Sequence, residues 1–128
     1  MTTVHQQRLI RPAKNIFGSL RLPGDNSISH RYGMLAAFAA GTSRFTNFST
    51  GADCASTLSC MSSLGASVRR LEDGSIEVTG VGGRVNQPSG PLDCGNSGST
   101  MRMMSGLLAA QQGEFTLIGD ASLSRRPM

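Results

Sequence analysis

The stretch with the clearest chemical potential is residues 23–31, where a turn leads directly into an apolar segment. Pro23 and Gly24 interrupt any preceding element, and Asn26 and Ser27 can both cap a helix that begins there. The free N–H groups of a first helical turn attract anions. Arg31 lies about one turn further along and can add a forked cationic contact. The pattern predicts a site for a phosphate or a carboxylate.

The same kind of run returns later in the chain, at residues 95–102. Glycine, asparagine and serine again precede an apolar segment, and Arg102 again lies about one turn into the expected helix. A glycine and then a Phe-Thr pair follow each helix, with the pairs at residues 45–46 and 115–116. We interpret this similarity as a weak internal repeat.

Other catalytic patterns are weak. Residues 80–83 lack the spacing of a dinucleotide-binding fingerprint, and no Gly-Lys-Ser/Thr is present. Ser27 has no Gly-x-Ser-x-Gly context, which favours binding over nucleophilic catalysis. Neither Asp25 nor Asp53 has a partner carboxylate nearby in sequence, so we expect both to cap helices.

The three cysteines, Cys54, Cys60 and Cys94, are an odd number and contain no Cys-x-x-Cys pair. This pattern argues against a disulfide framework and against a zinc knuckle, and it predicts reduced, partly buried thiols. The polar residues 1–14 lack the apolar core of a signal peptide, and no run approaches the ~20 apolar residues of a membrane span. We expect a cytoplasmic protein with no membrane partner.

The net charge of +4 raises the question of nucleic-acid binding. Lys14 is the single lysine among the 12 basic residues, and the arginines are scattered without forming a basic helix face. Aromatic residues for base stacking are few. Isolated arginines suit small phosphate or carboxylate ligands better, so no nucleic-acid partner is expected.

The expected elements of the first half alternate between short strands and two apolar helices. In chain order they are strands at residues 8–10 and 19–22, a helix at 27–40, a strand at 44–48 and a helix at 53–64. Gly41 and Gly65 are the expected left-handed caps of the two helices. The first helix is apolar enough to be buried on most sides.

The clearest hairpin joins residues 67–71 to 75–79, because Asp73 and Gly74 can supply the positive φ values that a tight turn requires. The remaining elements are a glycine-rich loop at residues 80–90, a helix at 103–110 and a strand at 115–118. No second helix and hairpin follow this last strand. We therefore expect the chain to be the front part of a longer architecture.

Three stretches resemble a known enzyme family. They are residues 22–31, residues 93–102 and the segment from 119–120 to 126–128. Their order and separations closely resemble the N-terminal third of 3-phosphoshikimate 1-carboxyvinyltransferase, also called EPSP synthase. The resemblance covers nearly the whole chain. The sister enolpyruvyl transferase that acts on UDP-N-acetylglucosamine shares the fold but not the serine-rich first motif.

The resemblance implies a bacterial, cytoplasmic enzyme of the shikimate pathway, which leads to the aromatic amino acids. It would transfer the enolpyruvyl group of phosphoenolpyruvate to the 5-hydroxyl of shikimate 3-phosphate and release phosphate. This addition and elimination need no metal and no cofactor. The expected partners are the two small anionic substrates, and a complementary C-terminal chain where the remaining sequence is a separate polypeptide.

The same resemblance implies an α/β (α+β) fold of two similar domains. Each domain is built from repeated β-α-β-α-β-β units with buried helices and outer sheets. On this basis residues 1–22 hold N-terminal strands that belong to, or link to, the other domain. Residues 23–90 form the first unit, and residues 91–128 form an incomplete second unit.

The resemblance also implies site residues, at the positions of this sequence that match the family's motifs. Ser27 and Arg31 match positions that hold shikimate 3-phosphate, and Arg31 pairs with its carboxylate. Gly98 and Arg126 match contacts to phosphoenolpyruvate, and a side chain at Gly98, the position linked to glyphosate sensitivity, would intrude on that small ligand. Asn26 stands where the family normally carries a lysine that contacts both substrates. Arg102 matches an arginine near the site, for which a binding role and a structural salt bridge are both open. The resemblance gives His30 a packing or capping role rather than a catalytic one.

The departure at Asn26 leaves two functions open. Asparagine can hydrogen-bond, but it adds no charge against two dianions. The family's general acid and base lie beyond Met128, so no catalytic residue is expected within this chain. The first function is the N-terminal part of an EPSP synthase, inactive without the remaining sequence. The alternative is a non-catalytic anion-binding fragment or pseudoenzyme.

Overall fold

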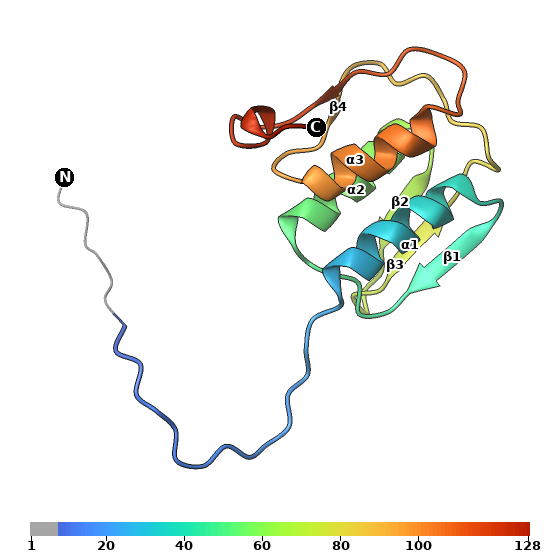
Figure 1. Cartoon of the computed structure of the whole chain (residues 1–128). Helices are drawn as coiled ribbons and strands as arrows, with labels where there is room; N and C mark the ends of the chain where they lie inside the picture. Colours follow the sequence, from blue (N-terminus) through green and yellow to red (C-terminus); the bar gives the residue numbers. More distant parts are fainter. Residues whose placement is uncertain (1–7) are drawn as a thin grey trace, which may run out of the picture.

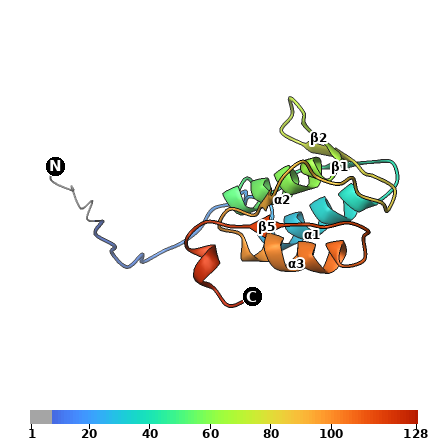
Figure 2. The same ribbon diagram turned by 90° about the horizontal axis from the view of Figure 1, so that it is seen from above.

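Three helices form the centre of the molecule and run side by side (Figure 1, Figure 2). The computed structural model describes residues 8–128. The helices are α1 (Asn26–Phe38), α2 (Ala52–Ser63) and α3 (Gly98–Leu108), and all three begin at the same end of the molecule. The free N–H groups of three first turns therefore lie on one side, which favours negative charge there.

A three-stranded antiparallel sheet packs against α1 and α2. Its strands are β1 (Thr42–Phe45), β2 (Ser67–Arg70) and β3 (Ile76–Thr79), in the order β1-β3-β2. In the register, Ile76 lies opposite Phe45 of β1 and Arg70 of β2. Ile76 and Val78 alternate with exposed or half-buried neighbours and are themselves buried, so one face of β3 turns toward the helices.

The predicted hairpin between β2 and β3 is confirmed. Gly74 has a φ of +79°, in the left-handed region that glycine adopts without a Cβ clash. Positive φ at both turn residues was expected, and this is wrong for Asp73. Instead its Oδ1 accepts hydrogen bonds from the Ser75 N–H at 3.0 Å and the Ser75 hydroxyl at 2.6 Å, which closes the turn.

The second half of the chain forms a strand-helix-strand arrangement. β4 (Leu92–Asp93) and β5 (Leu117–Ile118) are a short parallel pair, and α3 makes the crossover that parallel neighbours require. A single 3₁₀ turn, η1 (Leu123–Arg125), follows β5. Leu92 and Leu123 are buried, so the strand pair and the turn are both anchored in the core.

One continuous core joins the two halves. Its largest fully buried apolar side chains are Met61, Leu64, Ile76, Val78, Leu92, Met104 and Leu123. Each such side chain contributes about 1.5–3 kcal/mol when fully buried. The starts of the helices are therefore held in fixed positions relative to one another.

Residues 8–25 form no helix and no strand, so the strands predicted at residues 8–10 and 19–22 are not formed. A strand needs a partner for its backbone groups, and no segment within residues 8–128 pairs with this one. The large apolar side chains of the segment are 69–93% exposed: Leu9, Ile10, Ile16, Phe17, Leu20 and Leu22. The assignment of residues 1–22 to another domain stays a prediction, and residues 1–7 lie outside the described part.

The other elements form close to where the sequence predicts them, with shifted ends. α1 begins one residue early and stops before the predicted end, and α2 begins and ends one residue earlier than predicted. α3 starts at Gly98, earlier than predicted, because Ser97 caps it. β1 lies slightly before the strand predicted at residues 44–48, and Asn47, with a φ of +53°, interrupts extended backbone there. Only part of the strand predicted at residues 115–118 forms β5.

Residues 23–90 thus contain helix, strand, helix and two strands, without the leading strand of the predicted unit. Gly41 and Gly65 adopt positive φ values after the first two helices, as predicted. α1 is less buried than predicted, since Tyr32 and Leu35 are more than half exposed. Among residues 8–128, no helix is long and apolar enough to cross a membrane.

Candidate anion-binding site

The start of α1 is capped by Asp25. Its carboxylate accepts a hydrogen bond from the Ile28 N–H at 2.7 Å. Asn26 and Ser27, for which capping was predicted, lie inside the first turn instead, while the predicted capping by Asp25 is confirmed. Just before the cap, a Cβ on Gly24 would lie 1.7 Å from a backbone oxygen of the β1–α2 connection, so only glycine fits there.

Asn26 is held by three side chains near the start of α2. Its Nδ2 donates to Asp53 Oδ2, and its Oδ1 accepts from the Ser49 hydroxyl at 3.1 Å and from the Cys54 thiol at 3.0 Å. The hydrogen bond from Asn26 is the main cause that lowers the pKa of the Asp53 carboxyl below its ordinary value, against the opposing effect of burial. Asn26 is therefore fixed, neutral and close to a carboxylate.

Ser27 and Arg31 lie one turn apart on the same exposed face of α1. Within residues 8–128, no hydrogen bond or ion pair holds the Arg31 guanidinium. Its side chain borders an apolar hollow between α1 and α3, lined also by Met34, Leu35, Met103, Gly106 and Leu107. The cation is thus free to bind an anionic group beside Ser27.

The start of α3 is capped by a neutral side chain. Ser97 is buried, and its hydroxyl accepts from the Thr100 N–H at 3.1 Å. Gly98 follows as the first helical residue, and a Cβ built there would meet Arg126 Nη1 at 3.7 Å and Leu123 Cδ1 at 3.8 Å. These are ordinary van der Waals distances, so an alanine would fit the fold but would fill space directly beside the Arg126 guanidinium.

Arg126 is placed beside Gly98 by a chain of hydrogen bonds. Asp120 Oδ1 accepts from the Leu123 N–H at 2.7 Å and fixes η1. Asn96 Nδ2 donates to both Asp120 oxygens, at 3.0 Å and 2.8 Å, and Asn96 Oδ1 accepts from Arg126 Nη2 at 3.0 Å. The Leu123 N–H, followed by Asn96, lowers the pKa of the Asp120 carboxyl. The guanidinium is thereby oriented before any ligand arrives.

Arg102 donates from Nη2 to the Pro127 backbone oxygen at 2.7 Å. This contact is a hydrogen bond to the backbone and not the salt bridge that was one of the two expectations. It tethers the segment that carries Arg126 to α3. Arg102 therefore helps to position the segment that contains Arg126.

A buried polar chain connects the starts of α1 and α3. His30 Nδ1 and Thr57 Oγ1 lie 2.6 Å apart, Thr57 and Thr100 hydroxyls 2.7 Å apart, and the Thr100 hydroxyl donates to Ser97 at 2.7 Å. All four side chains are buried. His30 packs inside the fold, as predicted, and the chain fixes how the two halves of the candidate site are oriented.

Sequence reasoning gave no role to several residues that organise this site. Asn96 lies in the motif at residues 93–102, and Asp120 lies in the motif that begins at residues 119–120. The asparagine that recurs at each helix start could have indicated their role. Asp53 was expected only to cap α2, but Gly51 occupies the cap position and Asp53 lies in the first turn. Nothing in sequence spacing indicated that Thr57 and Thr100 would meet, because they are on different helices.

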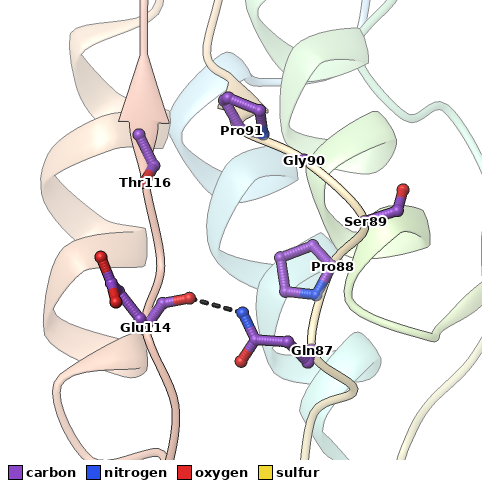
Figure 3. Close-up of a pocket in the computed structure, with 7 residues that line it drawn as sticks. All are labelled: Gln87, Pro88, Ser89, Gly90, Pro91, Glu114 and Thr116. Carbon is purple, nitrogen blue, oxygen red and sulfur yellow. Dashed lines mark hydrogen bonds between the residues drawn. The ribbon is translucent and has the colours of Figure 1, made fainter.

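A separate hollow lies between the loop at residues 87–91 and the segment before β5 (Figure 3). Gln87 Nε2 donates to the Glu114 backbone oxygen at 2.5 Å across it. The lining residues include Glu114 and no cation. This hollow does not suit a phosphate or a carboxylate.

Comparison with known proteins gives a consistent result. Residues 10–128 match the sequence profile of EPSP synthase (3-phosphoshikimate 1-carboxyvinyltransferase). The chain is 68% identical over 119 residues to the 3-phosphoshikimate 1-carboxyvinyltransferase of Koribacter versatilis (strain Ellin345), covering 93% of this chain and 28% of the relative. It is 54% identical to that of Solibacter usitatus (strain Ellin6076), with the same coverage.

A solved structure, an EPSP synthase from Acinetobacter baumannii, is similar with a TM-score of 0.80 and 42% sequence identity. The match covers 87% of this chain and 26% of that chain. The expected α/β fold is confirmed. The chain spans about 28% of the length of the curated relatives that it matches.

Proposed function

This chain belongs to the EPSP synthase family, and we propose that it is the N-terminal part of an enzyme that transfers an enolpyruvyl group from phosphoenolpyruvate to shikimate 3-phosphate. In this reaction the 5-hydroxyl oxygen of shikimate 3-phosphate forms a bond to the central carbon of phosphoenolpyruvate. The bond from that carbon to the phosphate oxygen breaks, phosphate leaves, and the hydroxyl proton is released. This chain binds and orients the two anions, and the remaining sequence supplies the acid and base.

The observation that carries the proposal is the arrangement of the two exposed arginines with the helix starts. Arg126 is held against Gly98 at the start of α3, and Arg31 lies one turn into α1 beside Ser27. The polar chain beneath them fixes the two helices relative to each other. Helix starts and forked cations at one end of a molecule stabilise bound carboxylates and phosphates.

We assign the roles residue by residue. Ser27 and Arg31 bind shikimate 3-phosphate, with Arg31 on its carboxylate. Gly98 and Arg126 bind phosphoenolpyruvate, where the missing side chain of Gly98 leaves room for the ligand. Asn26 contacts both substrates through the donor hydrogens of its Nδ2 amide.

A second candidate function rests on Asn26. Its amide nitrogen already donates to Asp53, and it brings no positive charge to the space between the two substrates. Losing a charged contact costs about 1.5–3 kcal/mol, or roughly tenfold to 150-fold in affinity. A protein with this loss can still bind anions without turning them over, which is the pseudoenzyme alternative.

The test is a joined protein, in which this chain is followed by the remainder of the Koribacter versatilis relative beyond the aligned region. Phosphate release is measured with both substrates, and shikimate 3-phosphate binding is measured by calorimetry. The control is the remainder of the relative alone. We expect phosphate release above that control. Binding without phosphate release would support the pseudoenzyme, and absence of both would contradict the proposed function.

A further inference from the structure

Three metal-ligating side chains of different types converge beside Asn26. A ring nitrogen of His30, a carboxylate oxygen of Asp53 and the sulfur of Cys54 all lie within 4.8 Å of one another, and His30 Nε2 is 3.4 Å from Asp53 Oδ2. They come from two helices, α1 and α2, that the core holds together. The substrate-binding roles proposed above use none of the three.

The cluster is closed on one side and open on the other. His30 and Cys54 are almost completely buried, while the Asp53 side chain is 37% exposed. An ion can therefore enter past the carboxylate and reach a nitrogen and a sulfur that water reaches poorly. Burial of these two ligands also limits how far they move, which preorganises the site.

The histidine is oriented by a partner on its far side. Its Nδ1 lies 2.6 Å from the Thr57 hydroxyl, which in turn lies 2.7 Å from the Thr100 hydroxyl. When Nδ1–H donates to Thr57 and the Thr57 hydroxyl donates to Thr100, the Nε2 lone pair faces Asp53. A hydrogen bond from the second ring nitrogen is what fixes a metal-binding histidine in most metal sites.

The spacing fits a tetrahedral ion after a small contraction. Bond lengths of about 2.0–2.3 Å in zinc sites place ligand atoms about 3.3–3.7 Å apart. His30 Nε2 and Asp53 Oδ2 are already 3.4 Å apart, and no two ligand atoms of the cluster are more than 4.8 Å apart. Asn26 Oδ1 lies 3.0 Å from Cys54 Sγ and can provide the fourth ligand.

We propose that His30, Asp53 and Cys54 bind a Zn²⁺-class divalent ion, with Asn26 Oδ1 as the fourth ligand. A nitrogen and a sulfur ligand select this class over Mg²⁺ and Ca²⁺, which prefer oxygen. The Cys54 thiol gives its proton to the buffer when the thiolate binds the ion. The bound ion places positive charge beside the neutral Asn26. This inference does not depend on the proposed enzyme activity.

The test is a titration of the chelator-treated 128-residue chain with Co²⁺, followed by displacement with Zn²⁺. A thiolate that binds Co²⁺ gives a charge-transfer absorption in the near ultraviolet, and tetrahedral Co²⁺ gives intense visible bands. We expect both, in a ratio of one ion per chain and unchanged by excess Mg²⁺. Zn²⁺ should remove them.

The matched variants are Cys54→Ser, Cys60→Ser and Cys94→Ser, which each replace one buried thiol. Cys54→Ser should abolish the charge-transfer band and weaken binding by at least about tenfold. Cys60→Ser and Cys94→Ser should leave band and affinity unchanged. The proposal is overturned if the wild-type chain shows no band, if the band survives in Cys54→Ser, or if all three variants weaken it equally, as an unfolded chain would.

Discussion

The starts of α1 and α3 are two versions of the same arrangement. In each, an asparagine next to the helix start donates its amide N–H to an aspartate further along the chain, Asn26 to Asp53 and Asn96 to Asp120. In each, the hydrogen bonds around the aspartate lower its pKa. The weak repeat seen in the sequence therefore corresponds to a repeated local structure.

The two versions differ in what faces the asparagine oxygen. Asn96 accepts a hydrogen bond from Arg126, whereas Asn26 accepts from Cys54 and from a serine hydroxyl. At the start of α3, a hydrogen bond to Asn96 orients the cation Arg126 within the described residues. The first start has only Arg31, one turn away and free of hydrogen bonds within residues 8–128. The α3 half is therefore organised before a ligand binds, whereas the orientation of Arg31 in the α1 half depends on the ligand.

The largest expected effect comes from removing either arginine in the joined protein. Arg126→Ala should raise the KM for phosphoenolpyruvate by about 100-fold, and Arg31→Ala should raise the KM for shikimate 3-phosphate by a similar factor, because each deletes a charged contact. Steady-state kinetics with each substrate varied in turn checks this. Arg70→Ala, on exposed β2, is the control and should change neither KM. Equal effects of one variant on both substrates would contradict the division between the two helix starts.

A smaller effect is expected from removing the Thr57 hydroxyl from the buried chain of hydrogen bonds that joins the starts of α1 and α3. Thr57→Val should lower the free energy of unfolding by about 1–3 kcal/mol, because it leaves the buried His30 Nδ1 without a partner and removes one hydrogen bond of the Thr100 hydroxyl, which keeps only its bond to Ser97. Urea unfolding of the 128-residue chain measures this. The control is Thr79→Val, which removes an exposed hydrogen bond between the hydroxyls of Thr42 and Thr79. It should change the free energy of unfolding by less than about 0.5 kcal/mol. A Thr57→Val chain as stable as this control would mean that the connection contributes nothing.

Removing the side-chain cap of α3 should lower the free energy of unfolding more than removing the cap of α1. Ser97→Ala should cost about 2 kcal/mol, since the buried Ser97 bonds both the N–H and the hydroxyl of Thr100. Asp25→Ala should cost about 1 kcal/mol, because Asp25 is exposed and solvent can replace its contact. Unfolding midpoints of both variants provide the comparison. The opposite order would contradict the view that the α3 start is the more rigid one.

The smallest expected effect is on the free energy of unfolding at acid pH. Because the folded pKa values of Asp53 and Asp120 are lowered, the unfolded chain binds more protons than the folded chain at low pH. Their stabilisation is present above the ordinary aspartate pKa of about 4 and is lost as the pH falls through the lowered values. Asp73, with a pKa of about 2, acts in the same direction. Asp53→Asn and Asp120→Asn should each reduce the loss of stability between neutral and acid pH, measured by urea unfolding, and an unchanged dependence in both would be the contrary result.

Local chemistry could be predicted from the sequence. The hairpin followed from Gly74, and the helices followed from apolar runs with caps, because these signals act within a few residues. The strands expected at residues 8–10 and 19–22 did not form, since apolar alternation does not create the strand partner that a sheet requires. The resemblance gave the family correctly from the motifs around Asn26, Gly98 and Arg126.

Contacts between distant residues could not be predicted. Asn26 meets Asp53 and Cys54 only because α1 packs on α2, and Arg126 reaches Gly98 only because Asp120 fixes η1. A linear pattern shows the residue types but not which helices pack together. For the same reason, the cysteine pattern, which argued against a zinc knuckle, did not indicate that His30, Asp53 and Cys54 lie together.

At its asparagine, the α1 half lacks the cation that Arg126 provides beside Asn96 in the α3 half. Calorimetric titration of shikimate 3-phosphate into the joined protein carrying Asn26→Lys tests this difference. Asn15→Lys is the control, because it adds the same charge at an exposed position outside the helices. We predict that Asn26→Lys tightens binding by at least about tenfold, the lower end expected for a charged contact, while the control stays at the wild-type affinity. Equal or weaker affinity for Asn26→Lys, or an equal gain in the control, would contradict the claim.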